Sequence, residues 1–190
     1  RLRDEGNKIY ITGSNARMLS RELGTHLTGR YIRRELFPFS FTDFLRLKDV
    51  QVPLLNELHG TEIKSRIRIL FQQYFEAGGF PVYLLNRNRD YLRDLYEGIV
   101  FRDILVRHKI TREREIRELL FFIAGNIAKE ATQNSLARIV GIKNSTTIKD
   151  YLGFFEDSFL VFTLFRYDDS IKRQLLAPRK LYFIDNALAS

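Results

Sequence analysis

The sequence of 190 residues has no cysteine, no tryptophan, one methionine and four prolines. Without cysteine, neither a disulfide framework nor a thiolate zinc site can form, which fits a reducing compartment. There is no run of eighteen apolar residues and no signal-like start, so we expect a cytoplasmic protein with no membrane-spanning segment. His26, His59 and His108 are isolated and lack metal-ligand spacing, so we expect no metal site.

What the chain does have is apolar residues and positive charge. Apolar residues make up 45% of it, which is ample for a buried core. The formal net charge is +8. This excess of positive charge favours polyanionic partners, first nucleic acid and then the phosphates of nucleotides. The alternative is that lysine and arginine simply solvate the surface.

The N-terminal stretch combines a strand pattern with small polar residues. Ile9 to Ile11 has the composition of a buried strand, and Thr12 to Asn15 follows it directly. Residues 16–23 can then form a helix with Ser14 or Asn15 as N-cap. Open α/β folds bind ligands at the carboxyl edge of their sheet, which is where these polar groups would lie. Arg30 follows a second turn of small residues and would be presented on a loop.

The middle of the chain predicts a small helical unit. Residues 31–36 alternate like a strand. Ser40 or Thr42 can then cap a short helix that runs to Leu47. Apolar residues at helical spacing predict three further helices, over residues 61–77, 90–106 and 111–124. Between the first two of these, Gly78 to Pro81 is typical of a helix end followed by a rigid turn.

The last third predicts a helix-turn-helix followed by a hairpin. A short helix ends at Gly141, and Asn144, Ser145 or Thr146 caps a longer helix. Residues 160–167 and 179–184 are strand-like, and the polar stretch 168–177 is predicted to be the hairpin loop between them. This order is typical of a winged helix.

Six short motifs follow one another along the chain: Thr12–Asn15, Leu27–Arg30, Pro38–Phe44, Gly78–Pro81, Arg102–Asp103 and Lys180–Asp185. Taken together and in this order, they resemble the motifs of bacterial and archaeal AAA-superfamily ATPases that carry a C-terminal region of unknown function. The chain departs from that family in having no G-x-x-x-x-G-K-[ST] loop and no apolar strand that ends in Asp-Glu. It also begins with Arg1 rather than methionine, so we expect the downstream part of a longer protein.

The resemblance, read together with the patterns, implies a mainly α fold with minor β (α+β). Residues 1–44 would be the end of an α/β P-loop core, residues 45–110 a helical lid, and residues 111–190 a winged-helix domain. In the intact protein, ATP binding would set the angle between core and lid and so reposition the winged helix. The alternative is a non-enzymatic winged-helix module, for DNA binding or protein interaction, with a helical extension.

The resemblance also implies roles for single residues. Thr12 and Gly13 would lie beside the nucleotide, and Ser14 or Asn15 would hold the attacking water. Arg30 would be an arginine finger that serves a neighbouring subunit, which requires self-association. ATP and Mg²⁺ are expected in the full-length protein. The fragment lacks a phosphate-cradling loop, so we expect it to bind neither and to be inactive alone. The alternative is an ordinary turn and a surface arginine.

The expected DNA contacts come from the second helix of the helix-turn-helix and from the wing. The N-terminal end of a recognition helix enters the major groove of duplex DNA, and basic residues of the wing can contact the backbone. The alternative is a winged helix that serves protein contacts. We expect Arg102 and Asp103 to form an ion pair rather than to carry out chemistry. The candidate DNA-binding residues are Lys143, Asn144, Ser145, Thr146, Thr147, Lys149, Lys172 and Arg173.

Overall fold

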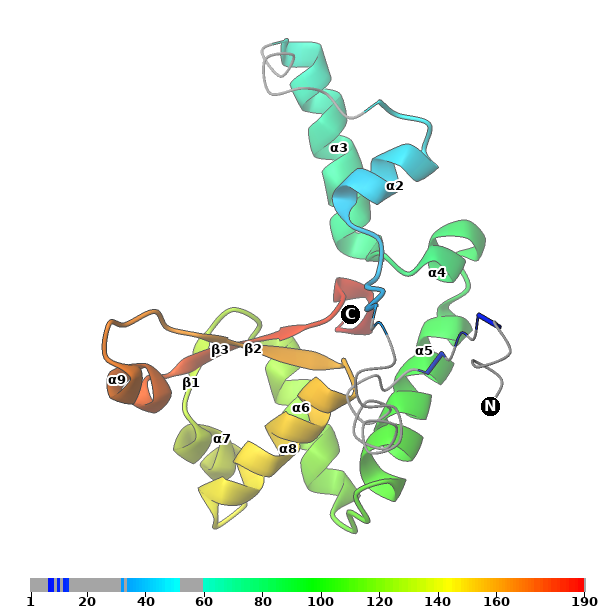
Figure 1. The fold of residues 1–190 in the computed structure, drawn as a ribbon. Helices are drawn as coiled ribbons and strands as arrows, with labels where there is room; N and C mark the ends of the chain where they lie inside the picture. Colours follow the sequence, from blue (N-terminus) through cyan, green and yellow to red (C-terminus); the bar gives the residue numbers. More distant parts are fainter. Residues whose placement is uncertain are drawn as a thin grey trace.

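The computed structural model describes residues 7–8, 10, 12–13, 32, 34–51 and 60–189. Within them the chain is mostly helical and has one three-stranded antiparallel sheet, which confirms the predicted mainly α class with minor β (Figure 1). Among the described helices, none is long and apolar enough to cross a bilayer. The division into domains at residues 44 and 110 stays a prediction.

Two helices form an arm that rises from the rest of the molecule in Figure 1. Helix α2 (Phe41–Leu47) begins at Ser40, as predicted, with a capping box between Ser40 and Asp43. Helix α3 (Thr61–Ala77) also matches its predicted range. A small core at the base of the arm contains Phe44, where the ring of Tyr74 lies 5.6 Å away.

Three helices run from the arm towards the C-terminal part. Pro81 opens helix α4 (Pro81–Asn86), so the predicted rigid turn is in fact the start of a helix, where proline's fixed φ suits the first turn. Helix α5 (Arg89–Gly98) continues directly as the π-helix η2 (Ile99–Val106), and the two cover the predicted helix 90–106. Helix α6 (Glu113–Gly125) follows. In η2 the buried carboxylate of Asp103 accepts two hydrogen bonds from Arg102, which confirms the predicted ion pair.

The C-terminal part holds the sheet and the main core. Strand β1 (Glu130–Ala131), helix α7 (Gln133–Ile139), helix α8 (Ser145–Asp157), strand β2 (Val161–Phe165), helix α9 (Ile171–Leu176) and strand β3 (Arg179–Phe183) follow one another. The strand order is β1-β3-β2. The single-turn helix η3 (Asn186–Leu188) comes last. The largest fully buried side chains of this core include Phe155, Ile104, Ile116, Leu120, Leu136 and Ile148.

The helix-turn-helix and the antiparallel pair β2–β3 are confirmed. The predicted hairpin loop 168–177 does connect the two strands, and it contains a helix that was not predicted, α9. The N-cap Ser170 of α9 accepts a hydrogen bond from the Arg173 N–H. A capped turn of helix satisfies backbone groups that an open loop would leave to water.

The strands predicted near the N-terminus are absent at the described positions. Tyr10 is 86% exposed and lies in no strand, and residues 34–36 have no regular structure. A strand needs a neighbour that pairs with its backbone, and none of the described strands pairs with these residues. The predicted helix 16–23 lies outside the described residues.

Candidate functional site

The base of the arm is a junction where three segments far apart in the sequence meet. Helix α3 ends at Gly78, whose φ of 70° is a left-handed value that suits glycine. At the next residue, the Phe39 N–H donates a hydrogen bond of 2.7 Å to the Gly79 carbonyl. A Cβ at Gly79 would collide with the carbonyl oxygen of Phe39 and lie only 2.8 Å from its nitrogen. The backbones can approach this closely only because residue 79 is glycine.

Asp185 connects the hydrogen-bonded residues Phe39 and Gly79 to the end of the sheet. It follows β3, is 7% exposed, and accepts hydrogen bonds from the Gly79 N–H at 2.7 Å and the Ala187 N–H at 2.9 Å. Burial raises the pKa of Asp185 above its usual range, although the hydrogen bonds from Ala187 and Gly79 favour the charged form. The carboxylate therefore caps η3 and holds the end of α3 at the same time.

Further contacts surround these hydrogen bonds. The Tyr74 hydroxyl donates to the Phe39 carbonyl at 2.8 Å, and the Asn186 amide donates to the Phe75 carbonyl at 3.2 Å. Two residues before Phe39, the ring of Phe37 meets that of Phe159 edge to face at 6.3 Å. Phe159 lies between α8 and β2. The segment 37–39 thus contacts both the arm and the end of the helix-turn-helix.

This junction brings together three of the motifs noted in the sequence: Pro38–Phe44, Gly78–Pro81 and Lys180–Asp185. Each motif is visible in the sequence, but their meeting is not, because nothing in their spacing links residues 39, 79 and 185. The one local signal was the Gly-Gly pair, which indicates a close approach of backbone.

The structure describes only part of the predicted nucleotide site. Thr12 and Gly13 are exposed and lie outside helices and strands. Ser14, Asn15 and Arg30 lie outside the described residues, so their predicted roles stay predictions.

The predicted DNA-binding residues occupy two elements. Asn144 caps α8 as expected, its side chain accepting a hydrogen bond from the Thr146 N–H at 2.9 Å. Lys143, Thr146 and Lys149 are exposed there, and Ser145 and Thr147 are half-buried. Lys172 and Arg173 lie on α9, where Arg173 pairs with Asp168 at 3.0 Å.

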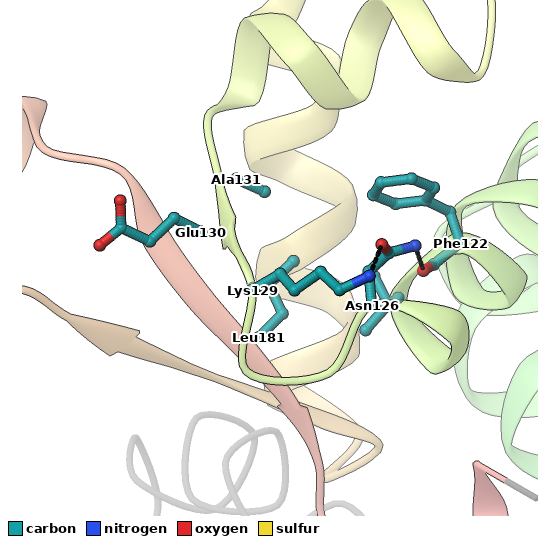
Figure 2. A pocket seen from close by; sticks show the side chains of 7 residues that line it. Phe122, Asn126, Lys129, Glu130, Ala131 and Leu181 are labelled. Carbon is teal, nitrogen blue, oxygen red and sulfur yellow. Dashed lines mark hydrogen bonds between the residues drawn. The ribbon is translucent and has the colours of Figure 1, made fainter.

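A small hollow of about 100 Å³ lies between the end of α6 and the strands β1 and β3 (Figure 2). Two of its polar side chains already bond within it: Lys129 Nζ donates to Asn126 Oδ1 at 3.0 Å, and Asn126 Nδ2 donates to the Phe122 carbonyl at 2.9 Å. Among the described residues, no group of three acidic, histidine or cysteine side chains could hold a metal ion. The junction therefore remains the best-developed feature.

Replacing Gly79 by alanine tests the close approach at the junction. Because the new methyl group meets backbone that cannot move aside cheaply, Gly79→Ala should lower the free energy of unfolding by about 1–3 kcal/mol. Gly98→Ala is the matched control, since nothing lies within 4 Å of a Cβ there. It should stabilise the protein by about 0.5–1 kcal/mol, because alanine favours helix. Denaturant unfolding measures both, and equal effects would contradict the packing described here.

The buried carboxylate predicts a pH-dependent contribution to stability. A raised pKa in the folded state means that the folded protein binds a proton more readily than the unfolded chain. Stability from Asp185 should therefore rise as the pH falls from neutral towards about 4, the ordinary range of a carboxyl group. In denaturant unfolding at several pH values, wild type should gain stability relative to Asp185→Asn over this range. The exposed control Asp94→Asn keeps Asp185 and should follow wild type, and a constant difference between wild type and Asp185→Asn would refute the assignment.

Two family models match different parts of the chain. A family model described as an AAA domain matches residues 1–45. The chain is 32% identical to an uncharacterized protein of Methanocaldococcus jannaschii, over 97% of the chain and 43% of that relative. It is 29% identical to an uncharacterized protein of Haemophilus influenzae, over 95% of the chain and 44% of that relative. The chain thus spans less than half the length of these relatives.

No solved structure matches the chain. A second family model matches residues 68–190, which is more than half of the sequence. The chain therefore belongs to the family described as a domain of unknown function, DUF8612.

Proposed function

We propose that this chain is the part of an AAA-type ATPase that transmits the state of the nucleotide to a C-terminal winged helix. The observation that carries the proposal is that the match to an AAA domain, residues 1–45, ends within α2. That segment contains Phe37 and Phe39, which contact the helix-turn-helix and the end of α3. The AAA-like part is thus attached directly to the junction.

In the proposed mechanism, the residues of the N-terminal stretch serve a nucleotide held by the full-length protein. Phosphoryl transfer needs an oriented water and positive charge beside the transferred group. Ser14 or Asn15 would hold the water, and Thr12 and Gly13 would lie beside the phosphates. Arg30 would place its guanidinium against the nucleotide of a neighbouring subunit. ATP and Mg²⁺ supply the reacting phosphoryl group and its charge compensation when bound.

A movement of the AAA-like core would reach the sheet through few contacts. The Phe39 N–H is hydrogen-bonded to the Gly79 carbonyl, and the Gly79 N–H is hydrogen-bonded to the Asp185 carboxylate after β3. These hydrogen bonds are short and partly buried, so displacing one partner carries the others with it or breaks the set. The junction is therefore suited to two discrete arrangements, as a nucleotide-driven switch requires.

The ATPase proposal is tested on the full-length protein with Arg30→Ala. Loss of an arginine finger should lower kcat by about 10³-fold or more while ATP binding persists. Arg34→Ala, at an exposed position outside the motif, is the control and should turn over ATP like wild type. If Arg30 acts on a neighbour, mixing Arg30→Ala with Asn15→Ala protein should restore part of the turnover. Equal kcat in wild type and Arg30→Ala would refute the assignment, and absence of ATP binding would refute the ATPase proposal as a whole.

A second candidate function, duplex DNA binding, is favoured by the order of elements after residue 112. The order is helix, strand, helix, helix, strand, the short helix α9 and strand, with sheet order β1-β3-β2. Apart from α9, which lies in the loop between β2 and β3, this is the arrangement expected of a winged helix. At the start of α8 the exposed side chains of Lys143, Thr146 and Lys149 could contact phosphates or base edges. The same function would suit a module without enzymatic activity.

Salt dependence of binding tests this candidate. The double variant Lys143→Gln/Lys149→Gln should weaken binding to a labelled duplex and reduce the slope of log K against log salt by about 0.9 for each phosphate that is no longer neutralised. Lys64→Gln on α3, also exposed, is the control for charge alone. Fluorescence anisotropy at several salt concentrations gives both quantities. If the control and the double variant have equal effects per charge, the start of α8 is not the duplex site.

A further inference from the structure

The hairpin β2–α9–β3 has an outward face on which aromatic rings lie beside a lysine. Val161, Leu181 and Phe183 point into the core, so their neighbours point outward. Phe162 and Tyr182 face each other across the two strands, and their rings stack at 5.3 Å with 14° between the planes. Phe162 is 45% exposed.

The row continues along the same face and past the end of β2. Leu164, 52% exposed, lies opposite Lys180. Beyond the strand, Tyr167 is 84% exposed. Phe165 and Arg179, which also lie opposite each other, belong to the other face of the two strands, and there the guanidinium lies 4.5 Å from the ring centroid. The outward face of the strands therefore carries two stacked rings, a leucine and a lysine, and the hairpin continues to α9 at the left of Figure 1.

The positive charge of the hairpin is largely uncompensated. Arg173 is paired with Asp168, but within the part of the chain that the structure describes no ion pair involves Arg166, Lys172 or Lys180. Glu130 lies opposite Lys180 on β1, and the two side chains form no ion pair there. A negatively charged partner would therefore be attracted to this face, and a second copy of the same basic hairpin would be repelled.

We propose that this hairpin binds single-stranded nucleic acid. Proteins that hold single strands combine cations that follow the phosphates with exposed rings on which unpaired bases stack. Phe162, Tyr182 and Tyr167 would supply the rings, and Lys180, Lys172 and Arg166 the cations. A duplex keeps its bases stacked on one another, so it could use the cations but not the rings. The proposal needs neither ATP turnover nor the duplex site on α8.

The experiment measures the anisotropy of a labelled oligothymidylate of about 30 nucleotides, long enough for several sites of this kind. Phe162→Ala should weaken binding by about 5- to 150-fold, the loss measured for one stacked base. Phe162→Leu, which keeps an apolar strand residue and removes the ring, should also weaken binding. Lys180→Gln should lower the salt slope by about 0.7. Phe121→Ala is the matched control, because Phe121 is 82% exposed on α6 outside the hairpin, and it should bind like wild type.

Two results would overturn the proposal. In the first, Phe162→Ala and Phe162→Leu bind the oligonucleotide as tightly as wild type does, or Phe121→Ala weakens binding as much as they do. The other is binding of a duplex of the same length with the same dependence on Phe162, since this would exclude stacking of unpaired bases. Lys143→Gln/Lys149→Gln removes charge but no ring, so it should weaken duplex binding more than oligothymidylate binding. This difference separates a failure of the duplex site from a failure of the hairpin site.

Discussion

The arrangement of the arm and the sheet depends on one buried carboxylate. Asp185 accepts two backbone N–H groups, one from its own turn at Ala187 and one from Gly79, 106 residues earlier in the chain. A buried N–H left without an acceptor costs about 1–3 kcal/mol, so an apolar side chain at 185 would leave the end of α3 unsatisfied. Burial raises the pKa of Asp185 because it disfavours the charged form, while the two backbone hydrogen bonds favour that form.

The bonds from Gly79 to Asp185 and from Asn186 to Phe75 both lie at the end of α3, and the segment 37–39 adds a connection elsewhere. Phe39 is bonded to the end of α3 on one side, and Phe37 packs on Phe159 at the end of α8 on the other. Two contacts at separate points restrict rotation about either of them. Edge-to-face rings can slide over each other more easily than a short hydrogen bond can stretch. The contact of Phe37 with Phe159 is therefore the one that would yield first if the segment 37–39 moved.

Elements whose ends are determined by neighbouring residues could be predicted from the sequence. Ser40, Gly78 and Asn144 bound their helices as predicted, because caps depend on residues within one turn. Apolar spacing did not distinguish η2 from an α-helix, because its eight residues form only about two turns and are too few to show a separate period. Helix α9 is too short for a periodic pattern to emerge. The junction could not be predicted at all, because its partners are separated by up to 106 residues and are mostly backbone groups.

Which part of the net charge of +8 can attract a partner depends on where the cations are paired with carboxylates. On α5 and α6, Arg117 bonds both Glu97 and Glu113, and Arg114 bonds Glu118, so these cations are largely neutralised by their neighbours. The pKa of Arg117 is raised by those two carboxylates, which keeps it charged and engaged. A polyanion that approaches α6 meets cations and carboxylates side by side, so attraction to the cations is offset by repulsion from the carboxylates. Salt screens what remains beyond a Debye length of about 10 Å. The hairpin offers cations together with rings, so it is there that the excess charge can be used for binding.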